Sequence, residues 1–145
     1  MRRMISFLRK DQRGSVAVEF ALVGPLLIGM LMGVLQIGVG MQNYNALRGI
    51  SADVARYSVI NYQTDNRLTV GQLQDYANGV AATAPYGLTR DRFTATISAA
   101  ATQRVSGATE YTITLDYDVP TMLSIIGIDE IPLSYSRPIF VIAAS

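Results

Sequence analysis

Residues 20–41 read FALVGPLLIGMLMGVLQIGVGM, and the chain has no charged side chain between Phe20 and Leu47. An α-helix rises about 1.5 Å per residue, so this run spans roughly 33 Å and can cross a hydrocarbon core about 30 Å thick. We therefore expect a transmembrane helix over residues 15–41, with residues 42–145 outside the membrane.

The charges before this run predict its orientation. Residues 1–14 carry five basic side chains against Asp11, a balance of 5 − 1 = +4, while residues 15–145 carry 7 − 10 = −3. Because basic residues remain on the cytoplasmic side, we expect a cytoplasmic N-terminus and a periplasmic C-terminal domain. A cleaved secretory signal is disfavoured, since the apolar run is too long and QNYN (residues 42–45) follows it without a small-residue cleavage pattern.

The amino-acid composition excludes several kinds of catalytic and metal site. The 145 residues include no His, Cys or Trp, so there is no zinc finger, cysteine nucleophile, Ser-His-Asp triad or disulfide. We expect no enzyme, catalytic residue, cofactor or metal site, and Asp116 and Asp118 are interpreted as surface charge on one strand face. Arg90 and Arg92 flank Asp91, which is too little positive charge for a nucleic-acid surface.

Glu19 interrupts the apolar sequence at its front, between Val18 and Phe20. A carboxylate beside the membrane is costly and often functional. The alternative is an acid that suits the positive end of the helix dipole at the headgroup level. The residue types alone leave both interpretations open.

Residues 13–27, RGSVAVEFALVGPLL, resemble the processing site of type IV prepilins of the Tad (Flp) class. More narrowly, they resemble the TadE-like pseudopilins, or minor pilins, which join an R-G pair, an A-V-E-F-A-L core and a proline, here Pro25. The resemblance implies that residues 1–14 are a leader and that a membrane prepilin peptidase cuts after Gly14 on the cytoplasmic face. Glycine offers an unhindered backbone at the scissile bond.

Cleavage at that bond would place a new amine on Ser15. Glu19 lies one helical turn away, so it can neutralise this amine or that of a neighbouring subunit. The resemblance favours the intermolecular pairing, with Glu19 and Phe20 serving assembly.

Three glycines and a glutamine recur at spacings of 4, 3 and 4, which aligns them on one helix face: Gly29, Gly33, Gln36 and Gly40. Small residues let helix backbones approach in lipid, and a glutamine can hydrogen-bond across the contact. We consider this a candidate helix-packing face, against the alternative of ordinary glycine frequency in membrane helices.

The sequence of residues 42–145 predicts an α+β, pilin-like fold. The long helix should continue to about Ile60, with an apolar stripe at Leu47, Ile50, Val54 and Tyr57. A loop should follow at residues 61–66, and then a short helix over 70–82 with Thr69 and Gln72 as its capping box. Alternating sequences at 93–98 and 111–119 predict two antiparallel strands, and a third at 132–143 should lie at an edge because it contains Pro138.

Residues 120–128, PTMLSIIGI, form an apolar connection between the last two strands. We expect a short buried helix that fills the small core, since a domain near 100 residues without disulfides needs its apolar groups. An exposed patch for a partner is the alternative.

These features predict a structural minor pilin of a Tad-type pilus, with a role in adhesion through the pilus. The resemblance implies a single-pass protein of the bacterial inner membrane, which can reach the extracellular pilus after assembly. Its partners would be a prepilin peptidase, other pilins or pseudopilins, the inner-membrane assembly platform and membrane lipid. The alternative is an unprocessed single-span envelope protein whose outer domain binds a ligand or a protein.

Overall fold

The computed structural model describes residues 13–64, 66–124 and 127–142. Residue contacts divide the chain into two units, residues 1–37 and residues 38–145. The second unit begins four residues before the expected domain start at residue 42. The expected leader lies outside the described residues except for Arg13 and Gly14.

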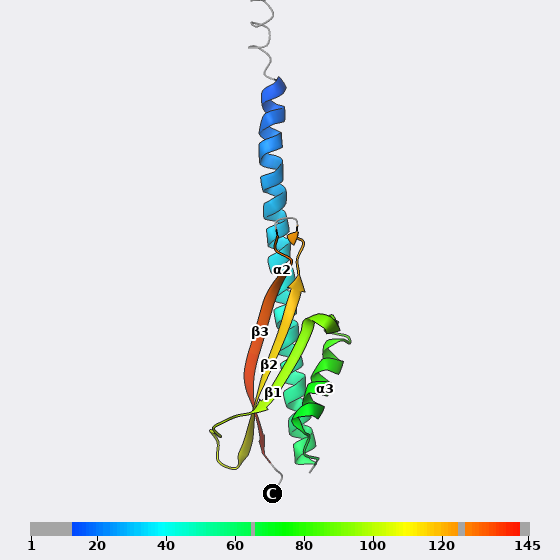
Figure 1. Ribbon diagram of the computed structural model, residues 1–145, viewed down its shortest axis with the longest axis vertical. Coiled ribbons are helices and arrows are strands. Elements are labelled where there is room, and N and C mark those ends of the chain that lie inside the picture. Colours follow the sequence, from blue (N-terminus) through cyan, green and yellow to red (C-terminus); the bar gives the residue numbers. More distant parts are fainter. Residues whose placement is uncertain (1–12, 65, 125–126, 143–145) are drawn as a thin grey trace, which may run out of the picture. The chain divides into compact units, whose positions relative to one another are not determined.

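A single long helix, α2 (Arg13–Gln63), contributes to both units (Figure 1). In the second unit it is followed by α3 (Val70–Ala81), a short 3₁₀ turn η1 (Arg90–Arg92), β1 (Phe93–Ala99), β2 (Ala108–Pro120) and β3 (Glu130–Ile142). The expected α+β class is confirmed.

The three strands form one antiparallel sheet in the order β1-β2-β3. The helices α2 and α3 cover one face of this sheet, with α3 beside β1 (Figure 1). Strand alternation sends apolar side chains toward the helices, and polar side chains occupy the opposite face. On that polar face the hydroxyl oxygens of Thr114 and Ser136 lie 3.0 Å apart.

The core of the second unit lies between the helices and the sheet. The predicted stripe of α2 contributes Leu47, Ile50 and Val54, all of which are fully buried. Tyr57, the fourth member of the stripe, stacks on Tyr76 of α3 with 3.9 Å between ring centroids. The stripe therefore packs the outer part of the long helix onto the rest of the second unit, as its helical period predicted. The second unit, residues 38–145, is called the head below.

The capping box of α3 is confirmed. The hydroxyl of Thr69 accepts a hydrogen bond from the backbone N–H of Gln72, and the side-chain oxygen of Gln72 accepts one from the N–H of Thr69. These two bonds satisfy N–H groups that the first helical turn leaves without partners.

The strand β3 is an edge strand, as Pro138 predicted. Proline has no N–H to donate, so Pro132 and Pro138 must occupy positions whose backbone faces away from β2. They remove two donors from the open edge of β3, which disfavours the addition of a further strand there.

Two expectations about connections were wrong. The long helix does not end near Ile60 but continues through Gln63, because the backbone bonding of the helix persists there: the N–H of Thr64 donates to the carbonyl of Ile60 at 3.2 Å. In residues 120–128 the side chains of Met122 and Ile128 are 58% and 42% exposed, so they do not fill the core. Ile125 and Ile126 lie outside the described residues.

Candidate functional site

The residues that the sequence singled out lie on the first part of α2. Gly14 and Glu19 are both exposed and helical, and Ser15 is helical while its side chain lies outside the described set. Residues 15 and 19 of a continuous α-helix are neighbours on one side, about 5–6 Å apart between Cβ atoms. The helix therefore provides the spacing that an interaction between the Ser15 amine and the Glu19 carboxylate requires.

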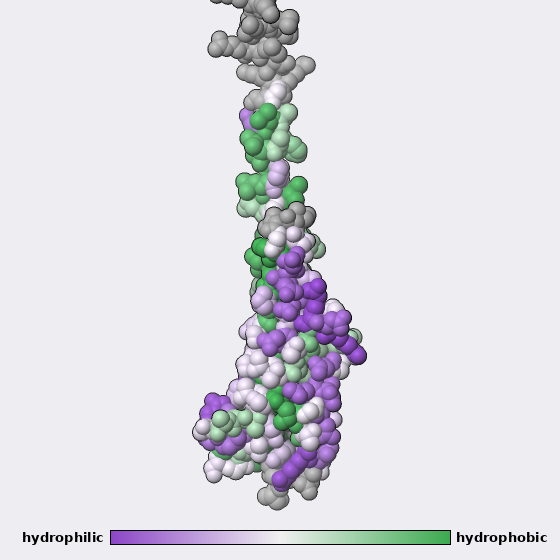
Figure 2. Space-filling view, in the orientation of Figure 1, coloured by the Kyte–Doolittle hydropathy of each residue, from purple (hydrophilic) through white to green (hydrophobic). Residues whose placement is uncertain are grey.

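The apolar side chains of this part of α2 point outward all around the helix. Phe20 is 78% exposed, Leu22 is 73% exposed and Leu31 is 60% exposed. Figure 2 shows hydrophobic residues on this stretch of the helix and more hydrophilic ones over the visible face of the head. A helix that is apolar all round needs an apolar surrounding, and this one is long and apolar enough to cross a membrane.

The candidate packing face lies on the same helix. A Cβ atom added at Gly29, Gly33 or Gly40 would meet no other side chain and no distant backbone within 4 Å. Intrachain packing therefore does not require glycine at these three positions. Gln36 is only 6% exposed, whereas Leu35 and Ile37 beside it are more than half exposed.

Sequence reasoning missed a polar contact that joins α2 to the connection after α3. The hydroxyl of Tyr86 donates to the carboxylate of Asp53 at 2.8 Å, and its ring lies against Gly49 one helical turn earlier. Burial and this carboxylate raise the pKa of Tyr86 to about 12. The four-residue spacing of Gly49 and Asp53 places a gap and a carboxylate on one side of the helix, which is the feature in the sequence that indicates a contact. No residue near them in the sequence indicates that Tyr86 is the partner.

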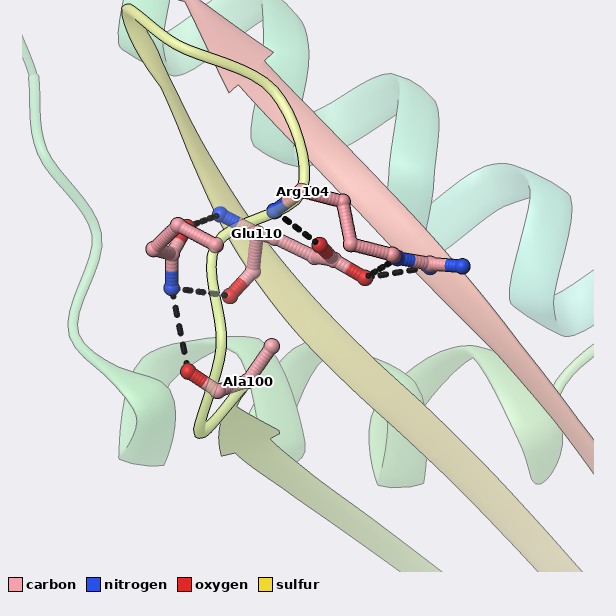
Figure 3. Close-up of polar contacts among 4 residues, drawn as sticks. Ala100, Arg104 and Glu110 are labelled. Carbon is pink, nitrogen blue, oxygen red and sulfur yellow. Dashed lines mark hydrogen bonds and ion pairs between the residues drawn. The ribbon is translucent and has the colours of Figure 1, made fainter.

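A second missed cluster holds the connection between β1 and β2. Glu110 is a buried carboxylate near the start of β2, and the guanidinium of Arg104 donates to it (Figure 3). The backbone N–H of Arg104 also donates to Glu110 at 3.2 Å, and Gln103 bridges the carbonyls of Ala100 and Glu110. The Arg104 guanidinium lowers the pKa of Glu110, so the cluster is an ion pair that orders a loop.

No group of three or more Asp or Glu side chains in the described residues could hold a metal ion. A cavity of about 400 Å³ beside α3 contains Asp75 and Arg90 among its described lining residues, with Phe93 as part of its wall. This arrangement provides no nucleophile with an adjacent base.

A single helix that is apolar all round and long enough to cross a bilayer fits a single-pass membrane anchor. The family model described as TadE-like protein matches residues 14–56. The resemblance to the TadE-like family, drawn from residues 13–27, is thereby confirmed. No curated protein and no solved structure matches the chain.

Proposed function

We propose that this protein is a structural, non-enzymatic minor pilin that takes part in the assembly of a Tad-type pilus. One observation carries the proposal: the TadE-like match starts at Gly14, the residue after which the leader is expected to be cut. The same match extends to residue 56 and so includes the membrane helix and the part of α2 that packs on the head.

In this mechanism the basic leader holds the N-terminus in the cytoplasm until a prepilin peptidase cuts between Gly14 and Ser15. The mature subunit then starts with an amine at the front of an apolar helix, where an uncompensated charge is costly. Glu19 compensates the amine of a neighbouring subunit and so sets the register between helices. The face at Gly29, Gly33, Gln36 and Gly40 lets those helices approach.

The proposed partners follow from these steps. They are the prepilin peptidase, other pilins and pseudopilins, the assembly platform of the inner membrane, and lipid before extraction. The head, outside the membrane, would contact other minor pilins in or at the tip of the filament.

The decisive experiment is the mass of the mature protein. When the chain is co-expressed with its prepilin peptidase, intact-mass spectrometry should show loss of residues 1–14. The change Gly14→Ala should block this loss because a side chain at the scissile position hinders the backbone. Gly24→Ala is the matched control, since an added Cβ there meets only the edge of Phe20 at 3.9 Å, and it should be processed normally.

Recovery of the full-length chain in the presence of active peptidase would contradict the proposal. That result would instead favour the unprocessed membrane-anchored envelope protein whose outer domain binds a partner.

A further inference from the structure

The cavity of about 400 Å³ beside α3 has the build of a small-molecule site, and the proposed function leaves it unexplained. Its floor is apolar, because the lining residues Leu88 and Phe93 are only 5% and 8% exposed. Its rim is polar and exposed, with Asp75 and Asn78 on α3 and Arg90 at the start of η1. Ligand sites typically combine a mostly apolar lining with a few polar groups, in cavities of about 300–1,000 Å³.

Main-chain hydrogen bonds fix the wall of the cavity that is formed by the connection after α3. The N–H of Leu88 donates to the carbonyl of Ala81, the last residue of α3, at 2.8 Å. The N–H of Phe93 donates to the carbonyl of Arg90, which ties the rim to the first residue of β1. The connection turns back at the end of α3 and leads into β1, which lies beside that helix (Figure 1). Because the folded backbone holds both walls, a ligand does not have to order the site.

Two opposite charges border this cavity without pairing. Asp75 and Arg90 are both lining residues, yet no ion pair among the described residues involves either of them. A ligand of one charge would be attracted by one of these groups and repelled by the other. A ligand that carries both signs can instead satisfy both, since a guanidinium binds a carboxylate and a carboxylate binds an ammonium group through charge-assisted hydrogen bonds. The charges of the rim therefore select for a zwitterion.

Gly79 leaves free space in the α3 wall of the cavity. It lies four residues after Asp75, so the missing side chain and the carboxylate share one side of the helix. An added Cβ atom at Gly79 would meet nothing within 4 Å, so packing within the chain does not require glycine there. Glycine also weakens a helix relative to alanine, and helix stability therefore does not explain the residue either. The absent side chain leaves room for a ligand to lie against α3.

We propose that this cavity binds a small zwitterion with an apolar side chain, of the class of a free α-amino acid or a dipeptide. The guanidinium of Arg90 binds the carboxylate of the ligand, and the carboxylate of Asp75 binds its ammonium group. Leu88 and Phe93 contact the apolar side chain, and the amide of Asn78 provides a donor and an acceptor between the two charges. The site belongs entirely to the second unit, so the inference does not depend on processing or on pilus assembly.

Isothermal titration calorimetry of the full-length chain in detergent at pH 7 tests the proposal, with leucine and dileucine as probes. We expect saturable binding of at least one probe to one site, with a Kd on the order of 0.1–1 mM, because charge-assisted contacts on an exposed rim stabilise a complex only modestly. The tighter probe shows whether the source is a free amino acid or a peptide. Leucinamide lacks the carboxylate and N-acetylleucine lacks the ammonium group, so each should bind at least about tenfold more weakly than leucine.

Variants of the rim assign the two contacts. Asp75→Asn and Arg90→Ala should each weaken binding of the tighter probe by about tenfold or more, since each removes one charge-assisted contact. Asp91→Asn and Arg92→Ala are the matched controls, because they remove the same charges from the two residues after Arg90, which do not line the cavity. Both controls should retain the binding of the natural chain.

Gly79→Leu tests the cavity itself. The fold has room for this side chain, so the near-ultraviolet circular dichroism should be unchanged while binding is lost. The proposal is overturned if neither probe binds the natural chain, if Asp75→Asn and Arg90→Ala bind as well as their controls, or if Gly79→Leu retains full binding. Leucinamide and N-acetylleucine that bind as tightly as leucine would show that only the apolar side chain is recognised, and the zwitterion would then be wrong.

Discussion

Gly49 of α2 lacks a side chain at the point where Tyr86, from the turn after α3, packs against the helix. A Cβ atom at this position would lie 2.6 Å from Cε1 and 2.7 Å from Oη of Tyr86, which is closer than atoms can approach. Glycine inside a helix costs about 1 kcal/mol relative to alanine. Here the absence of a Cβ atom leaves room for the ring of Tyr86 to lie on the helix and for its hydroxyl to reach Asp53.

We expect Gly49→Ala to lose more stability through the displaced tyrosine than it gains in helix propensity. Gly79→Ala is the matched control, because Gly79 is an exposed position of α3 where an added Cβ meets nothing within 4 Å. The control should be stabilised by about 0.5–1 kcal/mol. Gly49→Ala should be at least about 1 kcal/mol less stable than this control, given the usual cost of overpacking.

Chemical unfolding of the full chain in detergent, followed by near-ultraviolet circular dichroism of the tyrosines, measures this difference. Equal stabilisation by the two alanines would show that Tyr86 moves aside at no cost and that its contact with α2 is unimportant.

At the scale of elements, Tyr86 connects the turn after α3 to the outer half of α2. The folded protein raises the pKa of Tyr86 to about 12, above the value near 10 of an unfolded tyrosine. A raised pKa means that the folded state favours the protonated hydroxyl. Its contribution to stability is therefore fully present below about pH 10 and is lost as the pH rises toward 12.

We therefore expect the stability advantage of the natural chain over Tyr86→Phe to be constant from pH 8 to about pH 9.5 and to shrink above pH 10. Unfolding of both proteins at a series of alkaline pH values measures this difference, and the other tyrosines cancel because both chains share them. An advantage that does not change up to pH 11.5 would contradict the assigned hydrogen bond to Asp53.

The elements themselves were largely predictable from local patterns. The capping box at Thr69 and the alternation of Phe93, Ala95 and Ile97 depend on neighbours in sequence, and both predictions were confirmed. The end of α2 and the exposure of Met122 and Ile128 were not predictable in this way. Hydrophobicity alone does not distinguish an apolar side chain that fills a core from one at the tip of a hairpin.

At the scale of the whole molecule, Glu19 is proposed to act between subunits rather than within one. We expect Glu19→Ala to be processed to the mature mass, because the scissile bond is unchanged, but to abolish piliation. Intact mass and electron microscopy of the same cells measure the two steps separately. Glu130→Ala, which removes an exposed carboxylate of the head, should leave pili present.

Normal pili from cells that carry only Glu19→Ala would refute the register role of this residue. Loss of pili with Glu130→Ala as well would show that assembly responds to any lost carboxylate, and the assignment to Glu19 would also fail.

The sequence by itself determined the long apolar helix, the packing stripe of α2 and the TadE-like signature around Gly14 and Glu19. Each of these depends on residues a few positions apart, and helical periodicity brings such residues together without further information. Only the tertiary structure decided that Tyr86 lies on Gly49, that Glu110 is buried with Arg104, and that Met122 and Ile128 are exposed. Those features depend on how a sheet packs against a helix, since contacts between distant segments are set by packing and register rather than by local propensity.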